Sequence, residues 1–437
     1  MKKILRLLFS KKETRNASWI IGCRIAEMLL SFILGIWTAR YLGPSNYGII
    51  NYVASYVTFF TSFCTLGLNA IIVKELIDHP DEQGKTLGTA IVMRSVSSLL
   101  SIAAIVGIIC IVDRNETVTI MVAACSSIAL FFQVFDIFQY WFQSRYESKI
   151  SSIAALLGYV VVSGYKIYLL ISGAPVYLFA LSTSIDCIVV AIFLFIVYKK
   201  YGGAKLRFDF AKGKKLLQLG YHFILSGLMV SIYGQTDKIM LKHMLSEEAV
   251  GHYGTATALC KVWVFVLAAI IDSIVPTIMS LHKNGDREAY LKKNRQLYCI
   301  IFYVSVFVSL FFTLFGGLAV DILYGQAYHG AILPLKIITW YTAFSYIGVA
   351  RNAWIVCEGK QKYVKYMYLG AIFVNIGLNY LLIPVMQASG AALASLITQI
   401  MTSIILPLLW KEMRPNVRLI FEAVTFKNVF PEKRSKN

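Results

Sequence analysis

The sequence predicts an all-α integral membrane protein of twelve transmembrane helices, arranged as two six-helix bundles related by pseudo-twofold symmetry about the membrane normal. Three observations predict this fold class. Of 437 residues, 58% are hydrophobic and only 15% are charged, which is the composition of a chain whose main solvent is lipid. Apolar stretches long enough to span a bilayer recur almost from end to end. The basic segment 199–215 divides them into six and six.

Each span is placed by the rule that a transmembrane helix requires roughly 20 consecutive apolar residues. The N-terminal bundle, residues 1–198, is expected to contain spans at 17–39, 47–73, 87–112, 118–142, 151–171 and 176–198. After the linker 199–215, the C-terminal bundle, residues 216–410, is expected to contain spans at 216–241, 249–280, 297–320, 331–357, 363–386 and 389–410. Residues 411–437 form a basic tail.

The basic residues set the orientation of these spans. Lys and Arg near span ends are retained in the cytoplasm. If the N-terminus is inside, 32 of the 42 basic residues lie in cytoplasmic segments, and the opposite side holds only Arg40, Arg114 and Lys242. Both termini are therefore predicted to be cytoplasmic. The net charge of +19 then reflects contact with anionic lipid headgroups, and no nucleic-acid partner is predicted.

Two similar stretches indicate an internal duplication. ARYLGPSNYGIINYVAS (39–55) and KHMLSEEAVGHYGTATA (242–258) each contain a short polar turn, a glycine (Gly48 or Gly251) and a helix of small residues. Each stretch joins the first span of a bundle to its second. Because six is even, both bundles enter the membrane in the same direction, so the repeat axis would lie along the membrane normal.

Motifs for catalysis, metals and cofactors are not found. The eight cysteines lie inside or at the edges of spans and form no C-x-x-C pair, so neither a disulfide framework nor a zinc site is indicated. The segment EQGKTLG contains GKT, but His79 stands where a Walker loop requires its first glycine. We therefore predict no enzyme activity, no catalytic residues, no metal and no cofactor.

Charged residues inside the spans are the strongest functional signal. Each costs about 2.5 to 3.5 kcal/mol near the centre of a helix in lipid, so most are expected to face protein or water. Seven are cations and five are acids, which makes the membrane interior cationic. They are Arg24, Glu27, Arg94, Asp136, Lys166, Asp186, Asp237, Lys238, Lys261, Asp272, Lys336 and Arg351.

Uncharged polar residues also recur at helical spacing. The clearest stripe lies in the second span, where successive members are three or four residues apart: Asn51, Ser55, Thr58, Ser62, Thr65 and Asn69. Another in the fourth span contains Gln133, Asp136, Tyr140 and Gln143. Such stripes fit the lining of a hydrated cavity between the bundles, and they fit equally well hydrogen bonds between neighbouring helices. Likewise, Arg24 with Glu27 and Asp237 with Lys238 also fit simple charge neutralisation.

The chain resembles the polysaccharide-export or O-antigen flippases, called Wzx, of the multidrug/oligosaccharidyl-lipid/polysaccharide superfamily. The resemblance depends on ARYLGPSNYG, LGLNAIIVKEL (66–76) and QTDKIMLKHMLSEEAVGHYGTATAL (235–259) in this order, and on twelve spans over almost the whole chain. It implies translocation of an undecaprenyl-pyrophosphate-linked oligosaccharide across the bacterial cytoplasmic membrane by alternating access, coupled to a proton or sodium gradient. It also implies polysaccharide polymerase and glycosyltransferase partners.

This resemblance gives the polar residues hypothetical roles. Four cations would attract the pyrophosphate: Arg24, Lys238, Lys261 and Arg351. Four acids would balance them or bind the coupling ion: Glu27, Asp136, Asp237 and Asp272. Four uncharged residues would contact sugar hydroxyls: Asn51, Ser62, Asn69 and Gln133.

Two other functions stay open. A multidrug or cation antiporter has the same superfamily architecture but would favour an acidic interior, contrary to the charge count. A membrane polysaccharide polymerase or glycosyltransferase would typically have a large outer loop or a D-x-D metal motif. The predicted outer loops are short, and D-x-D does not occur in the sequence.

Overall fold

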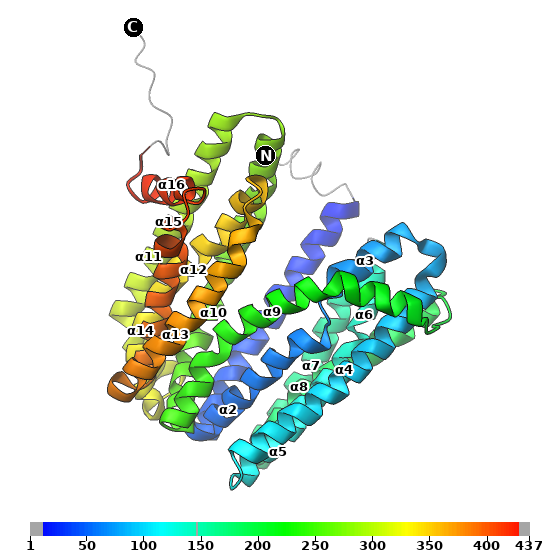
Figure 1. The fold of residues 1–437 in the computed structure, drawn as a ribbon. Helices are drawn as coiled ribbons and strands as arrows, with labels where there is room; N and C mark the ends of the chain where they lie inside the picture. Colours follow the sequence, from blue (N-terminus) through cyan, green and yellow to red (C-terminus); the bar gives the residue numbers. More distant parts are fainter. Residues whose placement is uncertain (1–11, 146, 428–437) are drawn as a thin grey trace. The chain divides into compact units, whose positions relative to one another are not determined.

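The structure is a computed structural model that describes residues 12–427 apart from residue 146; the side chains of residues 12–21, 222 and 226 also lie outside the description. Every regular element in the described residues is a helix (Figure 1). The predicted cytoplasmic ends, residues 1–11 and 428–437, are among those not described. The all-helical fold class is therefore confirmed for the described chain.

Two compact units divide the chain. The N-terminal unit contains the chain up to Leu42 together with Ile49–Ser231, and the C-terminal unit contains Gly43–Gly48 together with the chain from Ile232 onward. The division between the units therefore falls inside a helix, α9, and the segment 199–215 belongs to the N-terminal unit. The predicted division into two symmetric six-helix bundles stays a prediction.

The helices follow one another with short connections. The first eight labelled are α2 (Lys12–Cys64), α3 (Asn69–Asp78), α4 (Gln83–Val112), α5 (Thr117–Phe132), α6 (Ile137–Ser144), α7 (Ser148–Ser172), α8 (Val176–Lys200) and α9 (Phe210–Met244). The others are α10 (Glu247–Lys283), α11 (Arg287–Leu323), α12 (Ile332–Cys357), α13 (Val364–Met386), α14 (Ala388–Ile400), α15 (Leu406–Leu408) and α16 (Arg414–Val424).

Ten helices in the described residues are long and apolar enough to cross a membrane, and an eleventh is added if the bent pair Phe210–Tyr221 and Phe223–Met244 forms one span. The protein is therefore a multi-pass membrane protein. The first of the ten, Gly22–Asp78, contains the predicted span 47–73 and most of the predicted span 17–39. Gly43 separates them with φ 72° and ψ 169°, a conformation that favours glycine. Pro44, which has no backbone N–H, follows directly.

Three predicted spans are interrupted, which the sequence analysis did not foresee. The predicted span 47–73 is broken between the end of α2 at Cys64 and the start of α3 at Asn69. The predicted span 118–142 contains a 3-10 segment, Gln133–Asp136, between α5 and α6. The predicted span 389–410 contains a π-helical segment, Met401–Ile405, between α14 and α15. Counting apolar residues reports the length of a span but not its hydrogen-bond pattern. Such breaks release backbone groups that must find other partners inside a membrane.

The core of the N-terminal unit fixes the orientation of α6. Ile137, Phe138, Trp141 and Phe142 are completely buried on one face of this helix. The Trp141 indole N–H donates to Gln83 Oε1 over 2.9 Å, so this large side chain is also satisfied as a donor. The polar side chains of α6 therefore lie on its opposite face, away from this core.

Segment 199–215 packs against α4. The Arg207 N–H donates to the Gly84 carbonyl over 3.0 Å, and an added methyl group at Gly88 would lie 2.5 Å from the Arg207 carbonyl oxygen. Lys212 then pairs with Glu75 at 2.7 Å and Glu82 at 2.9 Å. Because Lys212 is buried, these pairs hold the segment to its own unit. Contact of its other lysines with lipid headgroups stays a prediction.

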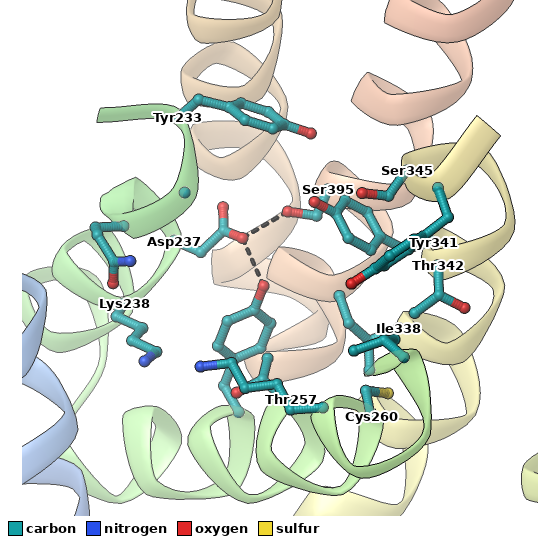
Figure 2. A pocket seen from close by; sticks show the side chains of 16 residues that line it. Tyr233, Asp237, Lys238, Thr257, Cys260, Ile338, Tyr341, Thr342, Ser345 and Ser395 are labelled. Carbon is teal, nitrogen blue, oxygen red and sulfur yellow. Dashed lines mark hydrogen bonds between the residues drawn. The ribbon is translucent and has the colours of Figure 1, made fainter. Parts of the chain in front are cut away.

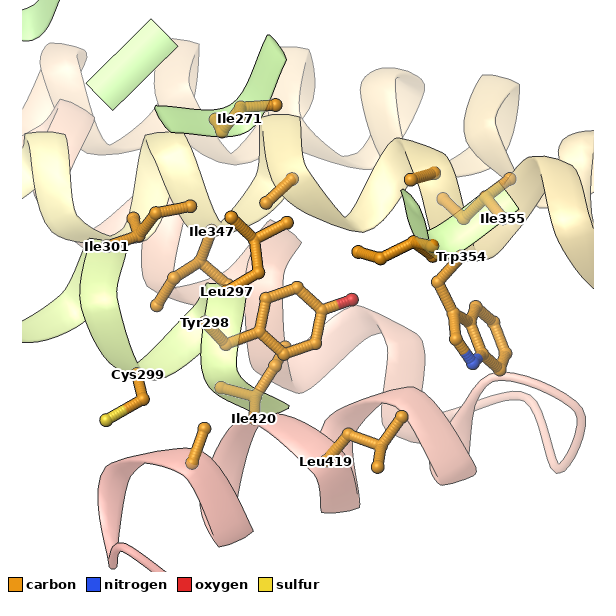
Figure 3. Packing of buried hydrophobic residues seen from close by; sticks show 14 of the residues in the cluster. Ile271, Leu297, Tyr298, Cys299, Ile301, Ile347, Trp354, Ile355, Leu419 and Ile420 are labelled. Carbon is orange, nitrogen blue, oxygen red and sulfur yellow. The ribbon is translucent and has the colours of Figure 1, made fainter. Parts of the chain in front are cut away.

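The core of the C-terminal unit joins α11, α12 and α16 (Figure 3). Leu297, Ile347 and Ile420 are almost fully buried in it, and Asn416 donates to the Tyr298 hydroxyl over 2.8 Å. Arg295 pairs with Glu422 at 2.8 Å. The predicted tail 411–437 therefore begins with a helix that is packed onto this unit.

Candidate functional site

A cavity of about 300 Å³ lies within the C-terminal unit. Helices α9, α10, α12 and α14 contribute its walls (Figure 2). Its polar lining contains three residues that the sequence analysis assigned to the site: Asp237, Lys238 and Lys261. The structure therefore brings together an acid and two cations from the predicted set, all within one unit.

Asp237 is the most completely bonded side chain of this cavity. Its Oδ2 accepts from the Tyr253 hydroxyl and the Ser395 hydroxyl, each over 2.5 Å, and Figure 2 marks both bonds. Its Oδ1 accepts from the side-chain amides of Asn375, over 3.1 Å, and Asn379, over 2.7 Å. A carboxylate at 5% exposure would be costly in lipid, and four donors offset that cost.

Four different helices supply this arrangement. Asp237 lies on α9, Tyr253 on α10, the two asparagines on α13 and Ser395 on α14. Sequence reasoning found only Asp237. Asn375 and Asn379 carried a usable signal, because two amides four residues apart occupy one face of an otherwise apolar span. Nothing comparable in the sequence connects Tyr253 or Ser395 with Asp237.

Two hydroxyl oxygens and two amide nitrogens contact the Asp237 carboxylate, and an amide oxygen lies on one of the same side chains. The Asn379 side-chain oxygen is buried and has no hydrogen-bond partner in the described part of the chain. Together with the Asp237 carboxylate and two hydroxyls, it offers the hard oxygen ligands that alkali and alkaline-earth cations prefer. Among the described residues, no group of three or more His, Cys, Asp or Glu is placed to hold a metal ion. The single negative charge of the Asp237 carboxylate matches the charge of a monovalent cation or a proton.

Lys238 and Lys261 give the same cavity a positive region. Lys238 follows Asp237 directly and extends in another direction from the carboxylate, as Figure 2 shows. Both lysines line the cavity, from α9 and α10, and two ammonium groups in one cavity repel each other. An anion placed between two ammonium groups relieves such repulsion, so this part of the cavity favours an anionic group.

A second cavity, of about 490 Å³, lies within the N-terminal unit. Arg24 and Glu27 from α2 contribute to its wall, and the remaining polar lining comes from α6 and α7. Two more predicted residues are thus placed at a cavity. They lie one helical turn apart on the same face of α2.

The four predicted sugar contacts have neighbours of their own and line neither cavity. Ser62 is 2.8 Å from the Ser231 hydroxyl, and Asn69 accepts from Arg94 over 3.4 Å. Asn51 accepts the Ser55 hydroxyl at its backbone carbonyl, and Gln133 begins the 3-10 segment after α5. For Ser62 this contact matches the bonding between helices that the sequence left open. Their sugar-binding roles stay predictions.

The remaining predicted charges are separate from the two cavities. Asp136 ends the 3-10 segment between α5 and α6, and Asp272 is exposed on α10. Arg351 is buried on α12, where its Nη1 donates to the carbonyls of Thr402, over 3.0 Å, and Ser403, over 3.2 Å. These carbonyls belong to the π-helical segment, so the guanidinium satisfies backbone groups that the broken helix releases.

Comparison with known proteins is consistent with this architecture. A family model described as polysaccharide biosynthesis protein matches residues 14–282. The chain is 22% identical over 395 residues to the capsular polysaccharide biosynthesis protein CapF of Staphylococcus aureus, and the alignment covers 88% of this chain and 96% of that relative.

Two solved structures show the same fold. One is the inward-facing conformation of a multidrug resistance MATE family transporter of the MOP superfamily, with a TM-score of 0.68, 15% identity, and coverage of 91% of this chain and 96% of that one. The other is the lipid II flippase MurJ in an inward closed conformation, with a TM-score of 0.66, 13% identity, and coverage of 95% and 93%. These likenesses show that the chain has the same overall fold as these two proteins.

Proposed function

The chain belongs to the polysaccharide biosynthesis protein family, and from this premise we propose that it is a flippase for a lipid-linked oligosaccharide. Its substrate would be an undecaprenyl-pyrophosphate-linked repeat unit, moved from the inner to the outer leaflet of the bacterial cytoplasmic membrane by alternating access. The observation that carries the proposal is the C-terminal cavity, where two lysines and a fully bonded buried carboxylate line one space within the membrane.

The physical problem of this substrate matches such a cavity. A sugar headgroup with a pyrophosphate cannot lose its water to hydrocarbon without a large cost, whereas its polyprenyl tail never has to leave lipid. A polar cavity therefore has to carry only the headgroup. No bond in the substrate is made or broken by this movement, which agrees with the absence of catalytic motifs in the sequence.

The pyrophosphate is assigned to Lys238 and Lys261. Both line the C-terminal cavity, and ammonium groups bind phosphate as point charges through charge-assisted hydrogen bonds. Glu27, Asp136 and Asp272 remain candidates for charge balance, and Arg24 and Arg351 remain further candidates for anion binding. The location, with both termini cytoplasmic, and the polymerase and glycosyltransferase partners are part of the same proposal.

The coupling ion is assigned to Asp237. A carboxylate whose four contacts come from three other helices changes its bonding when those helices move, so its affinity for Na⁺ or a proton depends on conformation. A gradient of that ion can then favour one conformation over another. The Asn379 oxygen on a neighbouring side chain, which has no hydrogen-bond partner among the described residues, supports a cation ligand.

Direct transport measurements test the lysine assignment. Purified protein in liposomes should move a fluorescently labelled undecaprenyl-pyrophosphate-linked oligosaccharide between leaflets. The double variant Lys238→Ala with Lys261→Ala is expected to lower this rate at least tenfold, because a hydrogen bond to a charged group contributes about 1.5 to 3 kcal/mol. Lys283→Ala, an exposed lysine on α10, is the matched control. Equal rates in the double variant and the control would rule out the lysine site.

Export in cells tests the arginine assignments. Arg24→Ala and Arg351→Ala are each expected to abolish surface display of the glycan, measured on gels of extracted polysaccharide after membrane expression is confirmed. Normal export with both variants would refute their anion-binding roles. Arg351→Lys separates a backbone-holding role from an anion-binding role, because one ammonium cannot reproduce the flat donor array of a guanidinium at Thr402 and Ser403 but keeps the positive charge.

A multidrug antiporter is the second candidate, and the likeness to a MATE family transporter favours it. The two functions predict different phenotypes. Deletion of the gene should cause accumulation of lipid-linked repeat units without a change in drug sensitivity. Increased sensitivity to cationic drugs with normal glycan export would instead favour the antiporter.

A further inference from the structure

The cavity of the N-terminal unit is formed by three helices that each contribute one face. Arg24 and Glu27 of α2 are three residues apart, and Gln139 and Gln143 of α6 are four apart. From α7 the cavity receives Ser148, Ser151, Ser152 and Ala155, which follow the spacing of one helical face. Three helices therefore each present side chains at helical spacing to one cavity, so the cavity is a regular feature of how these helices pack.

Packing elsewhere in the unit determines that these faces are polar. On α6, the hydrophobic face that contains Phe138 and Trp141 is completely buried in the core, so Gln139 and Gln143 are turned to the cavity. On α7, the four contributors are serine or alanine, whose short side chains leave space where larger ones would fill it. The result is an open volume of about 490 Å³, enough for at least one sugar ring, since ligand pockets start near 300 Å³.

The chemistry of the wall differs from that of the C-terminal cavity. The formal charges of Arg24 and Glu27 cancel, and the other polar groups are two amides and three hydroxyls. Amides donate and accept at once, as neutral sugar hydroxyls require, whereas a phosphate requires donors only. The Ser151 hydroxyl oxygen is shielded from solvent and lacks a hydrogen-bond partner among the described residues, although buried polar atoms normally have one.

The position along the spans indicates when a substrate would meet this wall. In the orientation predicted from the basic residues, the cytoplasmic ends of the fourth and fifth spans meet at residues 143–150. Gln139 and Gln143 lie just before this connection or in it, and the α7 serines lie at the beginning of the next helix. A repeat unit assembled in the cytoplasm would reach these groups first.

We propose that the N-terminal cavity is a glycan-binding subsite, in which Gln139, Gln143 and the serines of the first turns of α7 bind neutral sugar hydroxyls when the substrate is loaded from the cytoplasmic side. This inference rests on the proposed flippase function and deepens it. It assigns the sugar to the N-terminal unit and to residues other than Asn51, Ser62, Asn69 and Gln133. The probe that isolates this subsite is the oligosaccharide without its lipid and pyrophosphate.

The test measures binding of that probe to the full-length protein in lipid nanodiscs. The repeat-unit oligosaccharide of the same strain, released from its carrier by mild acid, is titrated by calorimetry. The double variant Gln139→Leu with Gln143→Leu is expected to weaken binding about tenfold or more, the loss expected of two hydrogen-bonding side chains. Gln361→Leu, an exposed glutamine before α13, should bind as the unmodified protein does. Leucine is close to glutamine in volume, and thermal stability in detergent verifies that the variants fold.

Separate outcomes decide the subsite and the flippase function. If the unmodified protein binds the free sugar and the double glutamine variant binds it equally well, the subsite is refuted while transport remains intact. If the protein moves the lipid-linked sugar but does not bind the free sugar at all, the subsite is also refuted. If the free sugar binds with the expected loss in the variant but lipid-linked sugar is not moved, the subsite stands and the flippase proposal fails. Ser151→Ala alone should weaken binding several-fold, and an unchanged affinity would remove this residue from the site.

Discussion

Gly48→Ala and Gly251→Ala are each expected to abolish glycan export and to lower the melting temperature of the purified protein substantially. The reason is a close approach of two backbones inside the C-terminal unit. A methyl group on Gly48 would overlap the Glu247 carbonyl oxygen, and one on Gly251 would overlap the Pro44 carbonyl oxygen. A backbone carbonyl cannot turn away as a flexible side chain can, so helix α10 and the turn at Gly43–Gly48 would have to separate.

The loss of stability in these two variants should exceed that of ordinary surface substitutions. Overpacking of a tight contact costs about 1 to 3 kcal/mol or more, and two helices must shift to accept the methyl group. Gly107→Ala and Gly377→Ala are matched controls, because an added methyl group at either position meets no atom within 4 Å. Both controls should leave stability unchanged or raise it, since alanine favours helix by about 1 kcal/mol. The melting temperatures of the four variants are measured by fluorescence-detected size-exclusion chromatography after heating. Equal melting temperatures would contradict the close contact.

This contact joins the two stretches that the sequence analysis placed in parallel. The similarity of 39–55 to 242–258 predicted corresponding turns in two repeats, but it gave no reason for glycine at both positions. The structure supplies the reason, because residues 43–48 belong to the same compact unit as the beginning of α10, and each glycine faces the other segment's backbone. Ser246 caps α10 by accepting from the Ala249 N–H, which explains the polar residues before Gly251.

The spans themselves were predictable because lipid imposes a minimum apolar length on every helix. Interruptions were not predictable in the same way, since the 3-10 segment at Gln133–Asp136 and the π-helical segment at Met401–Ile405 contain no glycine or proline to signal a break. Arg351 illustrates the difference. Its charge was read from the sequence as an anion-binding signal, whereas its visible contacts are two backbone carbonyls of the π-helical segment.

From the sequence, only those site residues could be predicted whose type is unusual at their position. Asp237, Lys238 and Lys261 were found because charge in a span is rare, and the structure places them at one cavity. Gln143 appeared in a polar stripe, but Gln139 did not, although it lies three residues after Asp136 and four before Gln143 and fits the same helical spacing. Ser148, Ser151 and Ser152 resemble the many serines of membrane helices. They differ from those other serines only because they line one cavity together with residues of α2 and α6.

Asp237→Asn is expected to reduce transport by at least tenfold and to remove its dependence on an ion gradient. The asparagine has nearly the shape of the aspartate, but its amide replaces one acceptor oxygen by a donor. Four donors then compete for one oxygen, and each buried donor left without an acceptor costs about 1 to 3 kcal/mol. The loss of negative charge also removes the attraction for Na⁺ or a proton on which the coupling proposal depends.

The decisive measurement is transport in liposomes with an imposed sodium gradient, an imposed proton gradient, or neither. The unmodified protein should be accelerated by one of the two gradients, and Asp237→Asn by neither. Asp81→Asn, an exposed acid between α3 and α4, is the control and should keep the response. If the Asp237 variant is slow but still responds to the gradient, the carboxylate organises Tyr253, Asn375, Asn379 and Ser395 without binding the ion. Asp237 would then have a structural role only. A response to the gradient in this variant must come from an ion-binding group other than Asp237.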